Sequence, residues 1–401
     1  MPVDTNQVVA SERQRIALVS GGTGGHLMPA LALARAMPSH DFDPLLLIEG
    51  REVERELVRR ELPDLEAHEV QRAGGTAGLP LWLGRTTMRA RRLLRDKSVS
   101  AVLSTGGRAS LPIALAAKQL RVPLFLLEQN AVVGRANRWL LPLARRMFTG
   151  LPASSPAAAK DVRKAARSTY TGTPLRAGFG HIEAGDARRS LGLAADVPVV
   201  LITGGSQGAR ALNECVPHAV LAAGRRVQVV HLSGLGNETA VRQRYAEVAH
   251  DTVATVRPVA ADMDRLFAAA DLVVCRGGGT TVAELMAVGR AAVILPYPHH
   301  KDRQQFWNAR VLEQRGAAMV LEEGHADLAA SLAAVLRDLL SSPDRLAAMG
   351  DAARTLRRLD AADAILRGMQ EELRDGGPGK LGARWDRGLP RPREDARGGA
   401  A

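Results

Sequence analysis

The stretch Ile16-Ala-Leu-Val-Ser-Gly-Gly-Thr-Gly-Gly-His26 decides the fold, because it joins a short apolar run to a glycine-rich turn and then to a helical pattern. A second stretch of the same kind, Val199-Val-Leu-Ile-Thr-Gly-Gly-Ser-Gln-Gly-Ala209, opens the other half of the chain. Strand, glycine turn and helix in this order are typical of the first unit of a doubly wound sheet. Two such openings predict an α/β protein with two Rossmann-like domains.

Short apolar runs alternate with amphipathic stretches along most of the chain, which predicts parallel strands with helices between them. The expected strands are Ile16–Ser20, Pro44–Glu49, Ala101–Thr105, Leu124–Glu128, Arg146–Thr149, Val197–Thr203, Val227–Leu232, Val253–Pro258, Leu272–Cys275, Ala292–Pro296 and Met319–Leu321. The expected helices include Glu52–Glu61, Ser110–Gln119, Ala209–Ala222 and Asp302–Gln314.

The chain of 401 residues is long enough for more than one domain. We expect a flexible N-terminus, two Rossmann-like domains, C-terminal helices and a disordered basic tail, over residues 1–14, 15–178, 179–350, 351–373 and 374–401. The join near Pro174–Asp196 contains several glycines and is expected to be a hinge linker.

Composition excludes some classes and leaves others open. The formal net charge of +12 indicates an anionic partner. Composition does not distinguish between nucleic acid, anionic lipid and a phosphorylated substrate. Two cysteines, Cys215 and Cys275, cannot form a disulfide framework and indicate a reducing compartment. The polar N-terminus shows no signal peptide, and no apolar run reaches the roughly 18 residues of a membrane-spanning helix.

The turn Gly21-Gly-Thr-Gly-Gly25 lies between an expected strand and an expected helix. Free N–H groups at a helix N-terminus favour anions, so the turn could hold a phosphate, and His26 could take a proton from an acceptor hydroxyl in the cleft. A tight turn without a ligand, with His26 bonded only to the backbone, is the alternative.

The segment Cys275-Arg-Gly-Gly-Gly-Thr-Thr-Val-Ala-Glu284 is a third turn of this kind. Its glycines leave the helix N-terminus bare, which suits a diphosphate, while Thr280 and Thr281 can donate hydroxyl hydrogens. Glu284, one turn later, could accept both hydroxyls of a ribose. Complementing the helix dipole is its alternative role.

The segment His299-His-Lys-Asp-Arg-Gln-Gln-Phe-Trp-Asn308 follows a strand end, where a doubly wound fold binds its ligands. The adjacent amides of Gln304 and Gln305 could contact sugar hydroxyls. No Cys or acidic partner has the spacing of a zinc ligand, so we expect no metal and no cofactor.

The stretch from Leu79 to Arg95 combines apolar residues with five arginines. It predicts an interfacial helix in which Leu81, Trp82 and Leu83 enter a bilayer while arginines contact anionic headgroups, with Arg85, Arg89 and Arg92 in that role. An amphipathic helix packed on the sheet, with a solvated basic face, is the alternative.

Taken together, these motifs resemble the MurG family of glycosyltransferases, which make lipid II for peptidoglycan. The resemblance is carried in collinear order over about residues 14–370 by Gly21–His26, Glu128-Gln-Asn130, Asn137-Arg-Trp139, Gly204–Arg210 with Asn213, Cys275-Arg276, Thr281–Glu284, His300–Gln305 and Trp307-Asn308. It implies a GT-B fold, with two Rossmann-like domains facing a cleft and a C-terminal helix that packs back toward the first domain. It also implies inverting, metal-independent transfer of GlcNAc from UDP-GlcNAc to the MurNAc 4-hydroxyl of polyprenyl-linked lipid I.

The resemblance also implies roles for individual residues. His26 is expected to be the base. The donor contacts expected in the second domain and before it are Arg176, Ser206, Gln207, Val259, Gly279, Thr280, Thr281, Glu284, Gln304 and Gln305. Thr23, Gly24, Gly25 and Asn137 are expected to reach the donor from the acceptor side, which Glu128, Asn130 and Arg108 line. The protein is expected to be peripheral on the cytoplasmic face of the plasma membrane, bound to its anionic surface, with no nucleic-acid partner.

Four positions depart from the family pattern. Arg108 replaces the usual tyrosine of Gly-Gly-Tyr, Thr173 replaces the asparagine of Gly-Asn-Pro, and Gly277 and Gly279 replace the serine and the alanine of Arg-Ser-Gly-Ala. The alternatives are a GT-B transferase with another lipid acceptor, a nicotinamide oxidoreductase with Glu49 on the ribose, and a non-catalytic nucleotide-binding protein.

Overall fold

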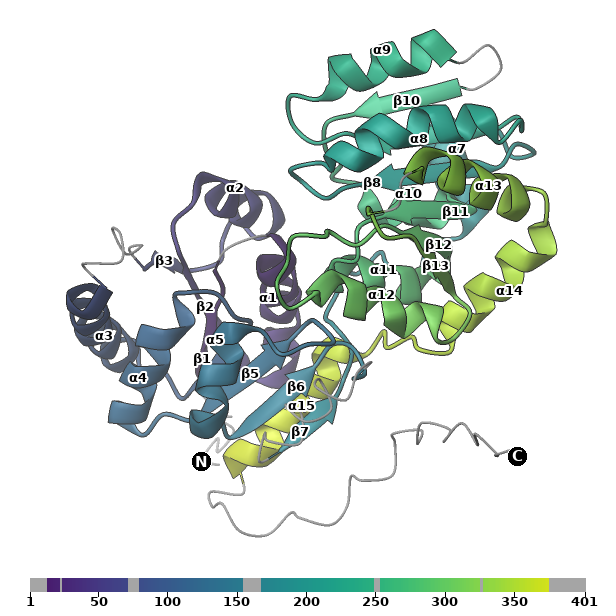
Figure 1. Ribbon diagram of the computed structural model, residues 1–401. Coiled ribbons are helices and arrows are strands. Elements are labelled where there is room, and N and C mark those ends of the chain that lie inside the picture. The colour runs from purple at the N-terminus through teal and green to yellow at the C-terminus, as the bar shows by residue number, and fades with distance from the viewer. Residues whose placement is uncertain are drawn as a thin grey trace, which may run out of the picture.

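The computed structural model describes residues 13–21, 24–70, 79–153, 167–248, 253–324 and 327–374, and the structural statements below concern these ranges. Within them the chain forms two parallel sheets, each covered by helices on both faces (Figure 1). The predicted doubly wound α/β architecture with two domains is therefore confirmed. The predicted N-terminal segment up to residue 12 and the tail from residue 375 lie outside the described residues.

The first sheet has seven strands in the order β3-β2-β1-β4-β5-β6-β7. They are β1 (Gln14–Val19), β2 (Phe42–Ile48), β3 (Ala67–Glu69), β4 (Ala101–Ser104), β5 (Leu124–Glu128), β6 (Arg146–Thr149) and β7 (Ser168–Tyr170). The helices between them are α1 (Gly24–Ala36), α2 (Glu52–Glu61), α3 (Leu79–Asp96), α4 (Ser110–Leu120) and α5 (Arg135–Leu140), with 3₁₀ turns η1 (Met37–His40) and η2 (Leu141–Leu143).

The second sheet has six strands in the order β10-β9-β8-β11-β12-β13. They are β8 (Val199–Thr203), β9 (Gln228–Leu232), β10 (Val253–Arg257), β11 (Leu272–Cys275), β12 (Ala291–Ile294) and β13 (Ala318–Val320). Its helices are α7 (Ala184–Leu191), α8 (Arg210–Ala222), α9 (Glu238–Val248), α10 (Met263–Ala269), α11 (Gly279–Val288), α12 (Gln304–Glu313), α13 (Leu328–Leu340) and α14 (Pro343–Arg354). The chain ends on α15 (Ala361–Arg374).

Both sheets reverse their strand order at the same place in the repeat. In the first sheet β1 lies between β2 and β4, and in the second β8 lies between β9 and β11. The crevice of an open α/β sheet forms at such a point, outside the carboxyl ends of the strands. The turns β1–α1 and β4–α4 of one domain, and β8–α8 and β11–α11 of the other, therefore lie at these crevices.

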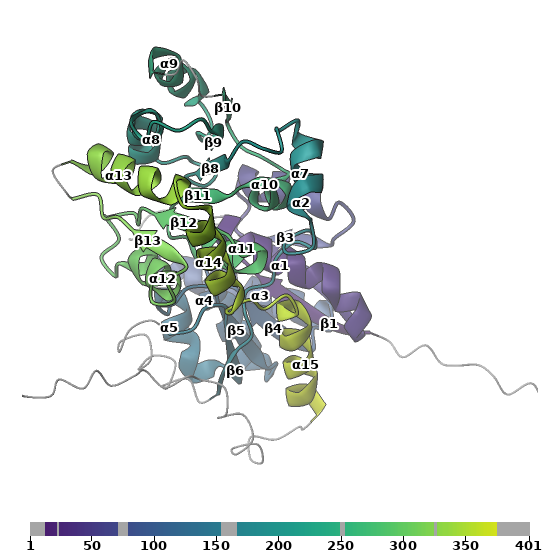
Figure 2. The same cartoon turned by 90° about the vertical axis from the view of Figure 1, so that its right-hand side faces the viewer.

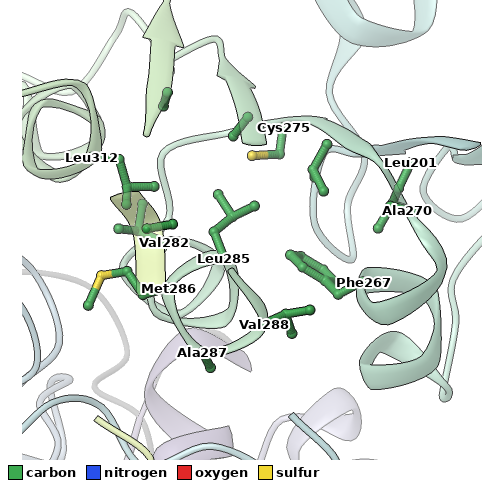
Figure 3. Packing of buried hydrophobic residues seen from close by; sticks show 14 of the residues in the cluster. Leu201, Phe267, Ala270, Cys275, Val282, Leu285, Met286, Ala287, Val288 and Leu312 are labelled. Carbon is green, nitrogen blue, oxygen red and sulfur yellow. The ribbon is translucent and has the colours of Figure 1, made fainter. Parts of the chain in front are cut away.

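The core beneath α11 explains how that helix is held. Val282, Leu285 and Met286 point from α11 into a cluster that also contains Cys275 from β11 and Phe267 from α10 (Figure 3). All five side chains are buried. Because burial of each large apolar side chain contributes about 1.5–3 kcal/mol, the helix is anchored firmly and its N-terminal Gly279 keeps a defined place.

The predicted hinge at Pro174–Asp196 is only partly a linker. Its second half forms α7, whose Ala187 is buried in the core of the second domain. Arg188 donates hydrogen bonds from Nε to the Ala269 carbonyl oxygen at 3.0 Å and from Nη2 to Asp271 at 2.6 Å. The glycines led to the prediction of a linker where α7 forms, because local composition does not show which core a segment packs against.

The C-terminal helix returns to the first domain. In Figure 1, α13 and α14 lie with the second sheet, whereas α15 (yellow) lies beside β6 and β7, and Figure 2 again shows it with the first domain. Ile365, Leu366 and Met369 are buried in the same cluster as Ile16 and Phe148. The helix therefore belongs to the core of the first domain. None of the helices in the described ranges is long and apolar enough to cross a membrane.

Candidate active site between the domains

His26 lies in the first turn of α1, and its ring is bonded to the end of β4. His26 Nδ1 lies 2.7 Å from the Thr105 carbonyl oxygen. Because a carbonyl oxygen only accepts, Nδ1 carries a hydrogen, and the tautomer that this contact selects has its lone pair on Nε2. A Cβ atom at Gly106, where φ is +106°, would lie 2.7 Å from Nδ1, so this turn requires glycine. The half-buried imidazole is thus held in one orientation.

The neighbouring turns of the first domain are joined by Glu49. Its carboxylate accepts hydrogen bonds from Arg108 N at 3.2 Å and from Arg51 Nη2 at 3.0 Å, and the residue is buried. This is the position that an oxidoreductase would use for a ribose, and here it is occupied by contacts with its own loops. Arg108 presents an exposed side chain at the same edge. Gly24 and Gly25 begin α1, while Thr23 lies outside the described residues.

The loop after β5 is organised around one buried carboxylate. Glu128 accepts hydrogen bonds from Asn130 N at 3.0 Å, Asn130 Nδ2 at 2.9 Å, Gly134 N at 2.9 Å and Asn137 Nδ2 at 2.9 Å. Three of these donors belong to the loop itself and the fourth to α5, so Glu128 fixes the shape of the loop after β5. The buried amide oxygens of Gln129 and Asn137 have no hydrogen-bond partner within the ranges the structure describes.

The second domain offers two glycine turns to the cleft. Ser206 and Gln207 are exposed on the β8–α8 turn. At the β11–α11 turn Gly278 is the N-cap of α11, and no side chain caps the helix there. Free N–H groups of this kind attract anions. A Cβ atom at Gly277 would overlap the Gln305 carbonyl oxygen, so the departure from serine accompanies a close approach of α12.

Glu284 lies on α11, one turn after its N-terminus, and the charge of Arg176 acts on it. Burial raises the pKa of Glu284 to about 8, with the charge of Asp264 adding to the effect and that of Arg176 opposing it. Arg176 donates from Nη1 to the Ala261 carbonyl oxygen at 2.7 Å and pairs with Glu61 of the first domain at 3.6 Å. Val259, two residues before Ala261, is exposed. The predicted ribose and base contacts therefore lie on neighbouring segments.

The segment before α12 lines a pocket between the domains. Its volume is about 250 Å³, and its lining residues are Arg135 of α5 with His299, His300, Lys301, Asp302 and Gln304. Gln305 Oε1 accepts a hydrogen bond from Tyr297 N at 3.0 Å, which orients that amide. No group of three or more His, Cys, Asp or Glu side chains in the described part of the chain is placed to hold a metal ion.

Direct contacts bring the two halves together. The Thr280 hydroxyl donates to the Gly25 carbonyl oxygen at 3.1 Å, which links the N-termini of α11 and α1. Asn308 is fully buried on α12; its Nδ2 donates to Asn130 Oδ1 at 3.0 Å, and its Oδ1 accepts from Ala131 N at 2.8 Å. A Cβ atom at Gly279 would lie 2.6 Å from the Gln129 carbonyl oxygen.

Sequence reasoning did not assign roles to Asn308 and Gln129. Asn308 lies four residues after Gln304, on the same face of α12, and that spacing was the available signal. Gln129 Nε2 donates to the Thr105 carbonyl oxygen at 3.1 Å, the same oxygen that holds His26. Nothing in the local sequence of Gln129 indicates this contact.

The predicted membrane patch is the exposed face of α3. Leu81 is 61% exposed and Met88, which was not predicted, is 62% exposed. Trp82 and Leu83 are half-buried, so they lie at the edge of this face. Five arginines (Arg85, Arg89, Arg91, Arg92 and Arg95) are exposed along the helix.

Comparisons with known proteins cover most of the chain. The glycosyltransferase family 28 N-terminal domain matches residues 16–149, and the family 28 C-terminal domain matches residues 199–365. The UDP-N-acetylglucosamine–N-acetylmuramyl-(pentapeptide) pyrophosphoryl-undecaprenol N-acetylglucosamine transferase of Stutzerimonas stutzeri is 39% identical over 360 residues, which are 88% of this chain and 96% of the relative. The enzyme of that name from Chromohalobacter salexigens is 37% identical over 377 residues, which are 91% of this chain and 98% of that relative. The crystal structure of Acinetobacter baumannii MurG superposes with a TM-score of 0.72 at 27% identity, covering 89% of this chain and 99% of that one.

Proposed function

The chain belongs to the MurG branch of glycosyltransferase family 28, and from that premise we propose how its cleft performs the reaction. The reaction transfers GlcNAc from UDP-GlcNAc to undecaprenyl-pyrophosphoryl-MurNAc-pentapeptide, lipid I, and yields lipid II and UDP for peptidoglycan synthesis. The fold is GT-B. The observation that carries the proposal is the contact of Thr280 with Gly25, because it brings the bare N-terminus of α11 beside the turn that bears His26.

The donor is proposed to bind on the second domain. Its diphosphate lies between the Ser206-Gln207 turn and the N-terminus of α11, where Gly279, Thr280 and Thr281 supply N–H donors and Thr281 also supplies its hydroxyl. Glu284 takes the ribose hydroxyls, the Val259 backbone meets the uracil, and Arg176 lies nearby. Gln304 and Gln305 contact the GlcNAc. The pocket lined by Arg135 and Gln304 supports this placement, since it opens between both domains.

The acceptor is proposed to bind on the first domain. Arg108, exposed at the β4–α4 turn, contacts the acceptor pyrophosphate. Gly24 and Gly25 offer the N–H groups at the N-terminus of α1 to the donor from this side. Glu128 keeps Asn130 and Asn137 in place through its hydrogen bonds. Thr23, by its position in the sequence, reaches the donor from the first domain.

The chemical step follows from these placements. The MurNAc 4-hydroxyl oxygen forms a bond to the anomeric carbon of GlcNAc while its proton passes to His26 Nε2. The bond between that carbon and the UDP oxygen breaks, and its electron pair leaves with UDP. The N–H groups at the start of α11 offset the charge that develops on the leaving diphosphate. Holding both substrates in one closed cleft supplies much of the rate.

Donor and acceptor choice is tested by competition among sugar nucleotides and acceptors. UDP release should be fast only with UDP-GlcNAc and a lipid I analogue, and slow with UDP-glucose or with diacylglycerol as acceptor. Equal rates with diacylglycerol would place the chain with a different lipid acceptor and contradict the proposal. The predicted metal independence is tested by adding EDTA, which should leave the rate of UDP release unchanged.

Glu284 should make donor binding depend on pH. The ribose hydroxyls need an ionised acceptor, and the raised pKa of about 8 means that Glu284 is largely protonated at neutral pH. The affinity for UDP-GlcNAc should therefore rise with pH and level off above about 8, by up to about tenfold per pH unit. Calorimetric titration from pH 6 to 9 measures this. Glu284→Gln should bind weakly with no such slope, and a wild-type curve that is equally flat would contradict the assignment.

The same raised pKa has a consequence for stability. The folded protein holds this proton more tightly than the unfolded chain, so Glu284 lowers the stability progressively as the pH rises from about 4.5 to about 8. Glu284→Gln should remove that loss and be the more stable protein at pH 9. This separates a binding defect of the variant from a folding defect.

The exposed face of α3 is proposed to attach the protein to the cytoplasmic face of the membrane, where lipid I presents its headgroup. Aspartate in place of both Leu81 and Met88 should reduce cosedimentation with vesicles rich in anionic phospholipid by at least about tenfold, since two inserted apolar side chains are lost. Binding of the wild type should also weaken as salt is added. Val53→Asp is the matched control, because Val53 is 51% exposed on α2. An equal loss for Val53→Asp would contradict the assignment to α3.

A further inference from the structure

The carboxyl half of β9 carries a buried polar network that the chemical step does not use. His231 has no exposed surface; its Nε2 lies 3.0 Å from Asn213 Oδ1 and its Nδ1 lies 3.0 Å from the Tyr245 hydroxyl oxygen. Because the amide oxygen only accepts, Nε2 carries the hydrogen and Nδ1 accepts from the hydroxyl. Burial lowers the pKa of His231 to about 4, so the ring is neutral. The two partners therefore fix a single tautomer.

The network ends on the turn that faces the donor. Asn213 belongs to α8, and its Nδ2 donates to the Ser233 carbonyl oxygen at 2.9 Å. That oxygen is pressed against Gly208, where φ is +73° and a Cβ atom would overlap it. Gly208 N in turn donates to the Gly205 carbonyl oxygen at 2.9 Å, which closes the turn bearing Ser206 and Gln207. A continuous path of contacts thus runs from α9, through His231, to the turn.

We propose that His231 is a positioning residue for the donor, which acts through Asn213 and the Ser233 carbonyl to keep the Gly204–Gly208 turn in its diphosphate-binding shape. The inference rests on the proposed function, because it concerns the same donor site. Ser206 and Gln207 are exposed and depend on the backbone for their placement. Without the ring, the buried oxygen of Asn213 loses its donor, and the amide no longer has one preferred orientation for holding Ser233.

Calorimetric binding of UDP-GlcNAc to the full chain tests this without the acceptor. His231→Leu removes both hydrogen bonds and should raise the donor Kd about tenfold, the equivalent of losing one buried hydrogen bond. His231→Gln keeps a donor and an acceptor and should stay within about threefold of the wild type. In turnover assays the KM for UDP-GlcNAc should rise in His231→Leu, while kcat and the KM for the acceptor change little.

Two further variants separate positioning from general loss of stability. Leu336 lies on α13, in the apolar cluster that also contains Tyr245, and Leu336→Ala should lower Tm without changing the donor Kd. Tyr245→Phe removes only the hydroxyl that holds His231 Nδ1, and should raise the donor Kd by about twofold to threefold even if His231→Leu fails to fold. A donor Kd that tracks Tm across all these variants would overturn the inference, and so would an unchanged Kd in both His231→Leu and Tyr245→Phe. A wild-type chain that does not bind UDP-GlcNAc would overturn the proposed function instead.

Discussion

Replacement of His26 by alanine should lower kcat by about 10²- to 10⁴-fold, the usual contribution of a general base. The Thr105 carbonyl oxygen holds Nδ1–H at 2.7 Å, and that contact leaves Nε2 as the only ring atom able to take the proton of the MurNAc 4-hydroxyl. The measurement is single-turnover formation of labelled disaccharide. Calorimetry with UDP-GlcNAc is the accompanying control, and the donor Kd should change by less than about threefold, because a base acts on the acceptor.

Gln129 supplies a matched variant for the same claim. Its Nε2 donates to the carbonyl oxygen that holds His26, so Gln129→Leu should disturb the orientation of the ring without removing the base. We expect a smaller loss of kcat, about tenfold, since one hydrogen bond is removed. If His26→Ala keeps near-normal turnover, the proton goes elsewhere and the assignment is wrong.

Replacement of Glu372 by alanine should destabilise the protein by about 3–5 kcal/mol, because it leaves the buried guanidinium group of Arg146 and the partly buried ones of Arg145 and Arg167 without their shared counter-charge. Glu372, on α15, is 1% exposed and pairs with Arg145 Nε at 3.2 Å, Arg146 Nη2 at 3.0 Å and Arg167 Nη1 at 2.9 Å. These arginines precede or begin β6 and β7, so the cluster fastens the C-terminal helix to the first sheet. Chemical unfolding followed by circular dichroism measures the change.

The neighbouring glutamate is the control for that experiment. Glu371 is largely exposed and lies 3.8 Å from Arg146, so Glu371→Ala should cost no more than about 1 kcal/mol. Equal losses for the two alanine variants would show that the buried charges do not anchor α15. Because α15 links the second domain to the core of the first, Glu372→Ala should also weaken domain closure and lower turnover.

The strands of both domains could be predicted because buried parallel strands are continuous apolar runs. Leu272–Cys275 has no exposed residue, and its limits agree with the prediction. The edge strands β3 (Ala67–Glu69) and β7 (Ser168–Tyr170) were missed. Each is three residues long, carries polar side chains and pairs on one side only, so neither produces an apolar run.

The helices were predicted where one face is apolar, and the misplaced features depend on tertiary contacts. α7 was taken as part of a hinge because its one buried residue, Ala187, gives no periodic signal. On α3 the apolar residues were recognised, but the rotation of the helix that exposes Met88 and half-buries Leu83 follows from its packing on α4.

The motif residues were found because glycine turns after apolar runs mark the ligand edge of such a fold. Their partners across the cleft were not. Asn308 holds Asn130 and Ala131 from the opposite domain, and Gln129 shares a carbonyl oxygen with His26. These contacts join residues that are far apart in the chain, and contacts of this kind cannot be predicted from a single sequence. The assigned substrate contacts and the domain limits stay predictions until they are measured.

The most direct measurement is the linkage of the product formed from UDP-GlcNAc, labelled with ¹³C at the anomeric carbon, and a lipid I analogue. We predict one labelled product, a β-linked GlcNAc on the MurNAc 4-hydroxyl, with an equal amount of UDP released and with formation slowed by at least about 10²-fold in His26→Ala. An α-linked product, a bond to another hydroxyl, or labelled GlcNAc released into water at the same rate would contradict the account.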